Sequence, residues 1–325
     1  MQIENTIIIG AGPCGLSCAL ELKKQGIDPL IIEKGNVVNT LYQFPTHQVF
    51  FSSSDKLEIG GVPFISPQKK PYRNEALTYY REIALRHQLR IQAFEKVIEV
   101  TKSGHVFYIQ TENNHAEKKS YQATHIIMAT GYYDQPNYLN IPGEELSKVS
   151  HYFKEAHPYF NQEVVVIGGK NSAVDAALEL HKAGASVTVL YRGSYYSKSI
   201  KPWILPEFDS LIKSEHVKMI FHAHVEEITS DYVTYQVNGQ THQLENDFVF
   251  AMTGYRPHHQ FLQLAGIEID VQTGTPTFNQ ETYETNISNL YIAGVIAAGY
   301  DGNKIFIENG RLHGKAIAAS IIHEA

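Results

Sequence analysis

Two glycine-rich turns, each set between an apolar strand pattern and a helical pattern, constrain the fold of this chain more than any other feature. The first follows Thr-Ile-Ile-Ile over residues 6–9, an expected strand, and reads Gly-Ala-Gly-Pro-Cys-Gly over residues 10–15. The second follows the apolar run 164–167 and reads Gly-Gly-Lys-Asn-Ser-Ala over residues 168–173. A strand, a glycine turn and a helix in this order hold a pyrophosphate at the helix N-terminus. The chain is therefore predicted to bind two nucleotides.

The first turn predicts a nucleotide without a 2′-phosphate. Its glycines permit the tight turn, the close approach of the pyrophosphate and the packing of helix on strand, in the order Gly10, Gly12 and Gly15. The next apolar strand, residues 29–32, ends on Glu33. An acidic residue about twenty positions after the first glycine is placed to accept hydrogen bonds from an adenosine ribose. FAD or NAD would satisfy this site, whereas NADP would not.

The second turn predicts a nucleotide that carries a 2′-phosphate. Lys170 stands where a glycine normally allows close approach, so its ammonium could instead meet a phosphate. The next strand, residues 186–190, is followed by Tyr191 and Arg192, and we interpret Arg192 as occupying the place that Glu33 has in the first copy. Arginine pairs with phosphate in a bidentate way, which favours NADPH. The segment after Arg192 is expected to help hold this phosphate through Tyr195, Tyr196, Ser197 and Lys198.

Length and composition agree with two α/β units. A chain of 325 residues exceeds one ordinary domain. Its net charge of −7 argues against a nucleic-acid partner. Neither a membrane span nor a signal peptide is expected, and with two cysteines no disulfide framework is expected, so the cytoplasm is the default location. Sixteen histidines show no metal-ligand spacing, so no metal is predicted.

The positions of the repeats predict how the domains follow one another. Residues 1–131 form the first segment of the FAD domain, 132–160 a linker, and 161–255 an inserted NADPH domain. The last segment, 256–325, is too short for a domain of its own and is expected to complete the FAD domain. Within these segments we expect helices over 74–87 and 304–322, and strands over 94–100, 106–111 and 290–294.

The whole chain resembles the thioredoxin-reductase-like flavoproteins, and in particular the bacillithiol disulfide reductase (YpdA) family. The resemblance rests on both glycine turns and on three further segments, Phe-Phe-Ser-Ser-Ser-Asp over 50–55, Ile-Lys-Pro-Trp-Ile-Leu-Pro over 200–206 and Ile-Phe-Ile-Glu-Asn-Gly over 305–310. It implies an α/β fold with two Rossmann-like nucleotide-binding domains, each of three layers, ββα. It also implies a homodimer or a higher oligomer of the same chain.

The resemblance implies an NADPH-dependent FAD enzyme that reduces a small-molecule disulfide. Its reactive thiol, carried over onto this sequence, is Cys14. The residues expected at FAD are Gly10, Gly12, Pro13, Cys14, Gly15, Glu33, Lys34, Gln43, His47, Val97, Gly131 and Gly294. The residues expected at NADPH are Gly168, Gly169, Lys170, Asn171, Ser172, Ala173, Arg192 and Lys198.

The residues alone leave the role of Cys14 open. A small residue packs well at this position of the turn, and a thiol at a helix N-terminus can have its pKa lowered. The pyrophosphate opposes that effect because its negative charge disfavours a neighbouring thiolate. Cys18, one helical turn further on, is expected in the core. His47 could donate a proton to a leaving thiolate, or it could be a hydrogen-bonded loop histidine.

Departures from related families weigh against other activities. The predicted NADPH domain lacks the Cys-x-x-Cys pair of thioredoxin reductases, so thioredoxin is not the expected substrate. The linker lacks the Phe-x-Gly-x-x-x-His signature of flavin monooxygenases, which makes that activity a minor alternative. The main alternative is a ferredoxin or flavodoxin NADP reductase, in which Cys14 would only pack. A non-catalytic NADPH sensor is a further alternative that no residue favours.

Overall fold

The computed structural model describes residues 3–323, and contacts between residues divide the chain into two compact units. Unit 1 contains the described residues up to Gln43, the segment His47–Gln135 and the described residues from Arg256 onward. Unit 2 contains Phe44–Thr46 and Pro136–Tyr255. Both ends of the described chain therefore belong to unit 1.

Unit 1 is built on a mixed sheet in the order β3-β2-β1-β6-β5-β4, with β15 also paired to β6. Strands β1, β2, β3, β6 and β15 pair in parallel, whereas β4, β5 and β6 pair antiparallel. The ends of β1 and β6 and the short strands β2 and β15 are apolar on both faces and buried, as parallel strands are when layers cover both faces. The strands are β1 (Ile3–Ile9), β2 (Leu30–Ile32), β3 (Arg90–Gln92), β4 (Glu95–Ser103), β5 (Val106–Asn113), β6 (Lys118–Met128) and β15 (Leu290–Ile292).

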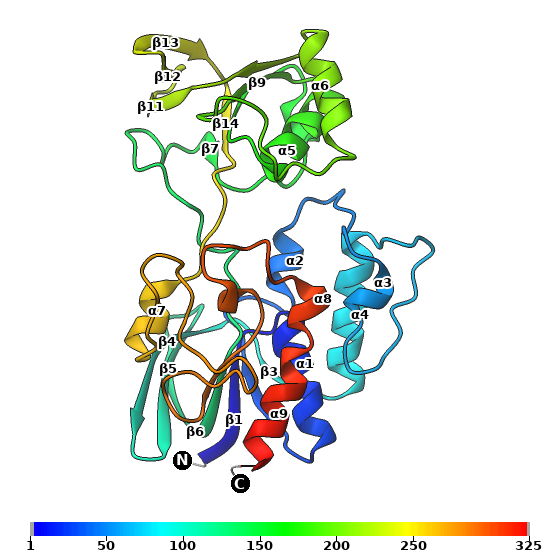
Figure 1. Cartoon of the computed structure of the whole chain (residues 1–325), viewed down its shortest axis with the longest axis vertical. Coiled ribbons are helices and arrows are strands. Elements are labelled where there is room, and N and C mark those ends of the chain that lie inside the picture. The colour runs from blue at the N-terminus through cyan, green and yellow to red at the C-terminus, as the bar shows by residue number, and fades with distance from the viewer. Residues whose placement is uncertain (1–2, 324–325) are drawn as a thin grey trace. The chain divides into compact units, whose positions relative to one another are not determined.

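The helices of unit 1 include α1 and α9, which lie side by side (Figure 1). Apolar residues of β1, β2, β6 and β15 form one core cluster with apolar residues of β4 and β5 and with Leu262. The helices are α1 (Pro13–Lys24), α2 (Asn39–Gln43), α3 (Ser54–Leu57), α4 (Arg73–Arg86), α7 (His259–Leu264), α8 (Ile307–Gly310) and α9 (His313–His323), with a 3₁₀ turn at Val295–Ala298.

The helix expected over 304–322 is interrupted at Arg311. Helix α8 ends at Gly310 and α9 begins at His313. The carbonyl oxygen of Arg311 accepts a 2.7 Å hydrogen bond from the hydroxyl of Ser17 on α1. Because this carbonyl is bound to another helix, a tertiary contact stabilises the break that local helix patterning did not predict.

Unit 2 has a parallel sheet in the order β10-β9-β8-β14-β7 and a separate antiparallel sheet β11-β12-β13. The parallel strands are β7 (Val149–Ser150), β8 (Glu163–Ile167), β9 (Ser186–Leu190), β10 (Val217–Ile220) and β14 (Phe248–Ala251). The antiparallel strands are β11 (His224–Ile228), β12 (Tyr232–Val237) and β13 (Gln240–Glu245). The helices are α5 (Asn171–Lys182) and α6 (Leu205–Lys213), with a 3₁₀ turn at His157–Tyr159.

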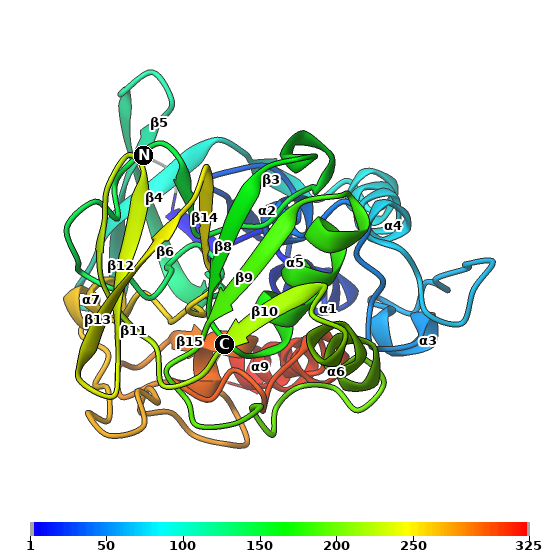
Figure 2. The same cartoon turned by 90° about the horizontal axis from the view of Figure 1, so that it is seen from above.

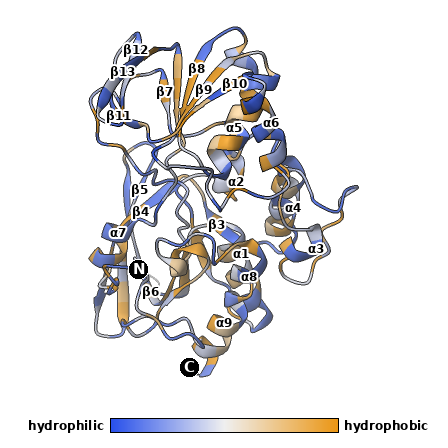
Figure 3. Ribbon diagram, turned by 45° about the horizontal axis from the view of Figure 1, so that its top comes forward, coloured by the Kyte–Doolittle hydropathy of each residue, from blue (hydrophilic) through white to orange (hydrophobic). Residues whose placement is uncertain are grey.

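The core of unit 2 has two apolar clusters on opposite faces of its parallel sheet. Val164 and Val166 of β8 pack with residues of α5 and α6, whereas Val165 and Ile167 pack with residues of β11 and β12. Figure 2 shows the helices and the antiparallel sheet on opposite sides of β8 and β9, and Figure 3 shows these strands as hydrophobic. Unit 2 therefore has three layers.

Residues 136–160 make up most of the predicted linker 132–160, and they lie within unit 2. Val149 and Ser150 pair in parallel with Val249 and Phe250 and add an edge strand to the sheet. A strand of two residues is too short to give an alternating apolar pattern, so only the pairing identifies it.

Candidate cofactor-binding and thiol site

Most of the residues expected at FAD lie in the segments that follow four parallel strands of unit 1. Ile9 of β1 pairs with Ile32 of β2 and with Met128 of β6. Met128 pairs in turn with Ile292 of β15. The carboxyl ends of these strands therefore lie at one edge of the sheet, which is where nucleotides bind in open α/β sheets. The segments that follow them contain the turn Gly10–Gly15, Glu33 and Lys34, Gly131, and Gly294.

The first glycine turn packs tightly on one side and is open on the other. A Cβ atom at Gly10 would lie 2.4 Å from the carbonyl oxygen of Ala129, and one at Gly15 would lie 2.0 Å from that of Gly10. Among the described residues, no atom lies within 4 Å of a Cβ position at Gly12. Helix α1 begins at Pro13, so its free N–H groups face this region. The turn therefore fits a pyrophosphate.

The carboxylate of Glu33 is oriented by the backbone. Glu33 is 7% exposed. Its Oε2 accepts a 2.8 Å hydrogen bond from the N–H of Ala11, and its Oε1 accepts one of 2.8 Å from the N–H of Gly35. A carboxylate oxygen can accept more than one hydrogen bond. The backbone can thus hold the carboxylate while its oxygens still accept hydrogen bonds from the hydroxyl groups of a ribose.

The other expected FAD residues occupy different environments. Lys34 forms an ion pair with Asp134, and burial is the main cause that lowers the pKa of Lys34. Gln43 ends α2, and His47 lies in the irregular segment that follows. The side chain of Val97 packs in the core, while the pairing of β4 with β5 is irregular just after this residue.

Arg73 fixes the end of α2, and sequence reasoning missed it. It is 6% exposed, and its guanidinium donates to the carbonyl oxygens of Leu41 at 3.1 Å and Tyr42 at 2.5 Å. The last carbonyls of a helix need such partners. Arg73 therefore anchors the segment that leads to Gln43. No local pattern indicates this role, since Arg73 lies thirty residues further along the chain.

Cys14 lies against two glycines from the C-terminal segment. A Cβ atom at Gly294 would lie 3.0 Å from the Sγ of Cys14, and one at Gly310 would also lie 3.0 Å from it. Cys14 is partly exposed, yet burial raises the pKa of its thiol to about 12. The lowered pKa that a helix N-terminus can produce is therefore outweighed by desolvation. Cys18 is fully buried, as expected, and burial is the main cause that raises its pKa.

His313, which the sequence did not single out, supports the wall of this thiol site. It is 5% exposed, its ring stacks on Tyr283 with centroids 4.1 Å apart, and burial lowers its pKa to about 4. Its Nδ1 accepts a 3.2 Å hydrogen bond from the N–H of Gly294. A neutral ring with its proton on Nε2 is required for this bond.

The second glycine turn lies between β8 and α5 in unit 2. A Cβ atom at Gly168 would lie 2.5 Å from the carbonyl oxygen of Met252, while Lys170 is exposed at the start of the helix and Ala173 is buried in the core. The amide of Asn171 is held by the backbone, because it donates to the carbonyl of Ser199 at 2.8 Å and accepts from the N–H of Lys201 at 2.9 Å. Asn171 thereby fixes the loop that carries the exposed Lys198.

The backbone register corrects one comparison between the two turns. The N–H of Gly10 donates to the carbonyl of Ile32, and that of Gly168 donates to the carbonyl of Leu190. The residue that follows Ile32 in the sequence is Glu33, and the residue that follows Leu190 is Tyr191. Tyr191, not Arg192, therefore occupies the place of Glu33, and Arg192 corresponds to Lys34. The sequence could not distinguish the two because the end of a strand is uncertain by a residue or two.

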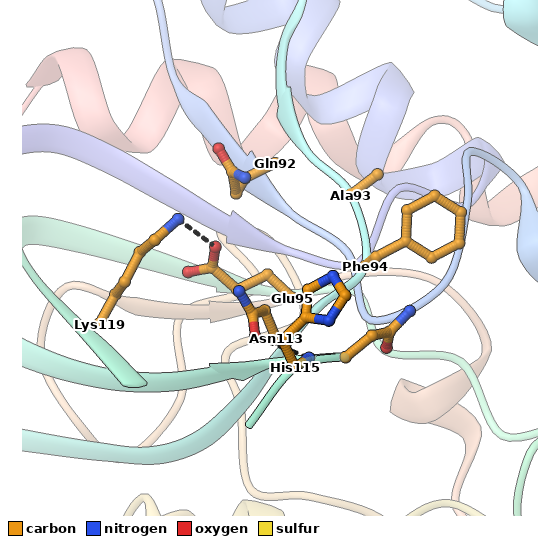
Figure 4. Close-up of a pocket in the computed structure, with 8 residues that line it drawn as sticks. Gln92, Ala93, Phe94, Glu95, Asn113, His115 and Lys119 are labelled. Carbon is orange, nitrogen blue, oxygen red and sulfur yellow. Dashed lines mark hydrogen bonds and ion pairs between the residues drawn. The ribbon is translucent and has the colours of Figure 1, made fainter. Parts of the chain in front are cut away.

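A separate cavity of about 240 Å³ lies at the end of β3 and β5 in unit 1 (Figure 4). Its buried carboxylate, Glu95, accepts a 2.5 Å hydrogen bond from the hydroxyl of Thr111 and forms a 3.2 Å ion pair with Lys119. Burial alone would raise the pKa of Glu95, but these bonds and one from Tyr121 hold it below its usual value. Glu95 is thus occupied by partners within the fold.

No helix in residues 3–323 is both long enough and apolar enough to cross a membrane. Within the same residues no group of three or more histidine, cysteine, aspartate or glutamate side chains is arranged to hold a metal ion.

Comparison with known proteins identifies the family. The family model described as pyridine nucleotide-disulphide oxidoreductase matches residues 7–294. The bacilliredoxin reductase Bdr of Bacillus subtilis is 60% identical over 321 residues, which cover 98% of this chain and 97% of that protein. The structure of bacillithiol disulfide reductase Bdr (YpdA) from Bacillus cereus is 59% identical, covers 100% of both chains and superimposes with a TM-score of 0.98.

A more distant structure shows how widely the fold is shared. Thioredoxin reductase from T. acidophilum superimposes with a TM-score of 0.78 at 22% identity, covering 100% of this chain and 99% of that one. This likeness confirms the thioredoxin-reductase-like α/β fold that the resemblance implied. Together with the edge of parallel strands in each unit, the matches show that this chain is an enzyme of the pyridine nucleotide-disulphide oxidoreductase family, whose cofactors are a flavin and a pyridine nucleotide.

Proposed function

We propose that this protein contains FAD and uses NADPH to reduce a low-molecular-weight disulfide, most directly bacillithiol disulfide, to its thiol. The observation that carries the proposal is 59% identity over the whole chain with a protein named as a bacillithiol disulfide reductase. A second protein, 60% identical, is named as a bacilliredoxin reductase. The partly exposed thiol of Cys14, within the turn that fits a pyrophosphate, supports it further. The proposal includes a cytoplasmic location and a homodimer or higher oligomer.

Residues of this chain would hold both cofactors and the substrate. Glu33 and the N-terminus of α1 hold the ribose and pyrophosphate of FAD, and the turn that begins at Gly168 holds NADPH. When bound, FAD would supply the redox chemistry, namely the transfer of two electrons from NADPH to the disulfide. The protein positions these groups and controls access to them.

Cys14 would attack one sulfur of the substrate, which forms a mixed disulfide and releases the other sulfur as a thiolate. Because burial raises the pKa of the Cys14 thiol, its proton must leave before the attack, and the thiolate that the attack releases takes up a proton to become the product thiol. Cys18 is not suited to resolve the mixed disulfide, since it is fully buried one turn further along α1. The electrons that release the second thiol would therefore come from the cofactor.

The two relatives are named for two different substrates, so the test uses several acceptors in parallel. NADPH oxidation is measured with bacillithiol disulfide, glutathione disulfide, an oxidised bacilliredoxin and an oxidised ferredoxin. We expect the highest kcat/KM with bacillithiol disulfide. A higher value with the bacilliredoxin would make the substrate a protein disulfide, and a higher value with ferredoxin would favour the electron-transfer alternative.

Substitution of Cys14 separates the two halves of the reaction. Cys14→Ala should retain NADPH oxidation with ferricyanide as acceptor and lose reduction of bacillithiol disulfide, because only the second process needs the thiol. Cys18→Ala is the matched control and should retain both activities, since Cys18 is buried in the core. If Cys14→Ala keeps full disulfide reductase activity, the thiol of Cys14 only packs.

A further inference from the structure

The two units share their hydrogen-bond register beyond the glycine turns. The N–H of Glu33 donates to Gln92, and its carbonyl accepts from Glu95. In the same way the N–H of Tyr191 donates to Ile220, and its carbonyl accepts from Ala223. Two residues further along, the carbonyl of Gly35 accepts from Phe94, and that of Gly193 accepts from His222. Tyr191 and Glu33 are therefore equivalent positions, and so are Gly193 and Gly35.

Unit 2 has the ring of Tyr191 where unit 1 has the carboxylate of Glu33, and this difference leaves two backbone N–H groups without an acceptor among the described residues. In unit 1 the carboxylate of Glu33 takes the N–H groups of Ala11 and Gly35. The equivalent N–H groups in unit 2 belong to Gly169 and Gly193. Among the described residues, neither of these two N–H groups has a hydrogen-bond acceptor. Two N–H groups of unit 2 are thus left as donors, whereas their equivalents in unit 1 bind a carboxylate.

The ring of Tyr191 packs on the same two glycines. A Cβ atom at Gly169 would lie 2.4 Å from the Cγ of this ring, and one at Gly193 would lie 2.5 Å from its Cε1. Neither glycine has a positive φ, so their backbone would accept other residues. They must be glycine here because the ring occupies the space of a side chain. Ala11, the counterpart of Gly169, has a Cβ atom and faces a carboxylate instead of a ring.

The charges near this position favour an anion. Arg192, Lys198 and Lys170 are exposed, and no described carboxylate forms an ion pair with any of them. A carboxylate in the place of Tyr191 would repel a second negative group close to it. An aromatic ring does not.

We propose that Tyr191 determines the choice of coenzyme in unit 2. By taking the place of the ribose-binding carboxylate, its ring removes the negative charge that would exclude an adenosine 2′-phosphate. The N–H groups of Gly169 and Gly193 and the guanidinium of Arg192 then serve as donors for that phosphate. This inference rests on the proposed use of NADPH and names the residue that makes this use possible.

The test restores the carboxylate that unit 1 has. Tyr191→Glu should lower the ratio of kcat/KM for NADPH over NADH by about 100-fold or more, because the new carboxylate repels the phosphate and takes both N–H groups. Tyr191→Gln has the same shape without the charge and should change the ratio much less. Tyr191→Phe keeps the ring and should leave the ratio unchanged. A ratio that is equal in Tyr191→Glu and the wild type would overturn the proposal.

Binding of fragments separates this proposal from the proposed function. Calorimetry with 2′,5′-ADP and 5′-AMP measures the preference for the 2′-phosphate without any turnover. If the wild type binds both equally, the assignment of NADPH is wrong. If the wild type prefers 2′,5′-ADP and Tyr191→Glu keeps that preference, NADPH is correct and the role of Tyr191 is wrong.

A packing test does not depend on the folding of Tyr191→Glu. Gly169→Ala should lower the Tm by about 3 °C or more, because the new Cβ meets the ring. In the background of Tyr191→Ser, which has no ring, the same substitution should lower the Tm by less than half as much. An equal loss in both backgrounds would show that the ring does not occupy this position.

Discussion

The N–H of Gly294 donates a 3.2 Å hydrogen bond to the Nδ1 of His313. The bond links the end of β15 to the first residue of α9, and Gly294 in turn contacts the side chain of Cys14. Gly294 has a φ of +79°, a conformation that side chains disfavour. His313 therefore helps to hold a glycine in an unusual conformation beside the thiol.

The state of His313 should make the protein less stable in acid. Burial lowers its pKa from 6.5 to about 4, so between these pH values the unfolded chain binds a proton that the folded chain does not. The free energy of unfolding therefore decreases as the pH falls from 6.5 to 4, by about 3 kcal/mol from this group at the acid limit. Urea denaturation at pH 7, 5.5 and 4.5 measures this loss.

The matched control for this effect is His313→Gln, whose side-chain oxygen can still accept from Gly294 but does not titrate. Buried carboxylates elsewhere in the chain contribute equally to the pH dependence of unfolding in the wild type and in the variant. The free energy of unfolding of the variant should thus decrease less between pH 7 and pH 4.5. Parallel pH curves for the two proteins would mean that His313 titrates normally.

We expect the stability effects of substitutions at Gly310 and Cys14 to depend on each other, because a side chain added at Gly310 would meet the sulfur of Cys14. A Cβ at Gly310 would lie 3.0 Å from the Sγ of Cys14, so Gly310→Ala should lower the free energy of unfolding by about 1–2 kcal/mol. In the Cys14→Ala background the sulfur is absent, and the cost should shrink. A double-mutant cycle in urea measures this coupling. Equal costs in both backgrounds would contradict the contact. Gly294→Ala is the contrasting variant, because its positive φ keeps a cost that no change at Cys14 removes.

The hydroxyl of Thr111 should stabilise unit 1 through Glu95. Thr111 is fully buried and donates a 2.5 Å hydrogen bond to that carboxylate. Thr111→Val keeps the shape and removes the donor, so it should lower the free energy of unfolding by about 2 kcal/mol at pH 7. Thr111→Ser keeps a hydroxyl and should cost less. Because bonds to the charged form hold the pKa of Glu95 low, the difference between valine and wild type should shrink only in strong acid, where the carboxylate is protonated.

The glycine spacing by itself predicted two nucleotide-binding units, and the match to the family confirms the fold and the class of enzyme. This was possible because a strand, a tight turn and a helix are local, and the turn tolerates few residues. The apolar runs before Gly10 and Gly168 likewise predicted buried parallel strands, since a strand covered on both faces has no polar alternation.

Only the tertiary structure decided which residues surround the thiol and the second nucleotide. Gly294 and Gly310 come to Cys14 from nearly three hundred residues away in the chain, and His313 accepts a hydrogen bond from the N–H of Gly294. The burial of the thiol, which no local pattern encodes, raises its pKa. Likewise, the position equivalent to Glu33 differs by one residue from the sequence prediction, so that Tyr191 and not Arg192 occupies it. Strand pairing settles that register, because backbone hydrogen bonds connect segments whose separation in sequence carries no signal.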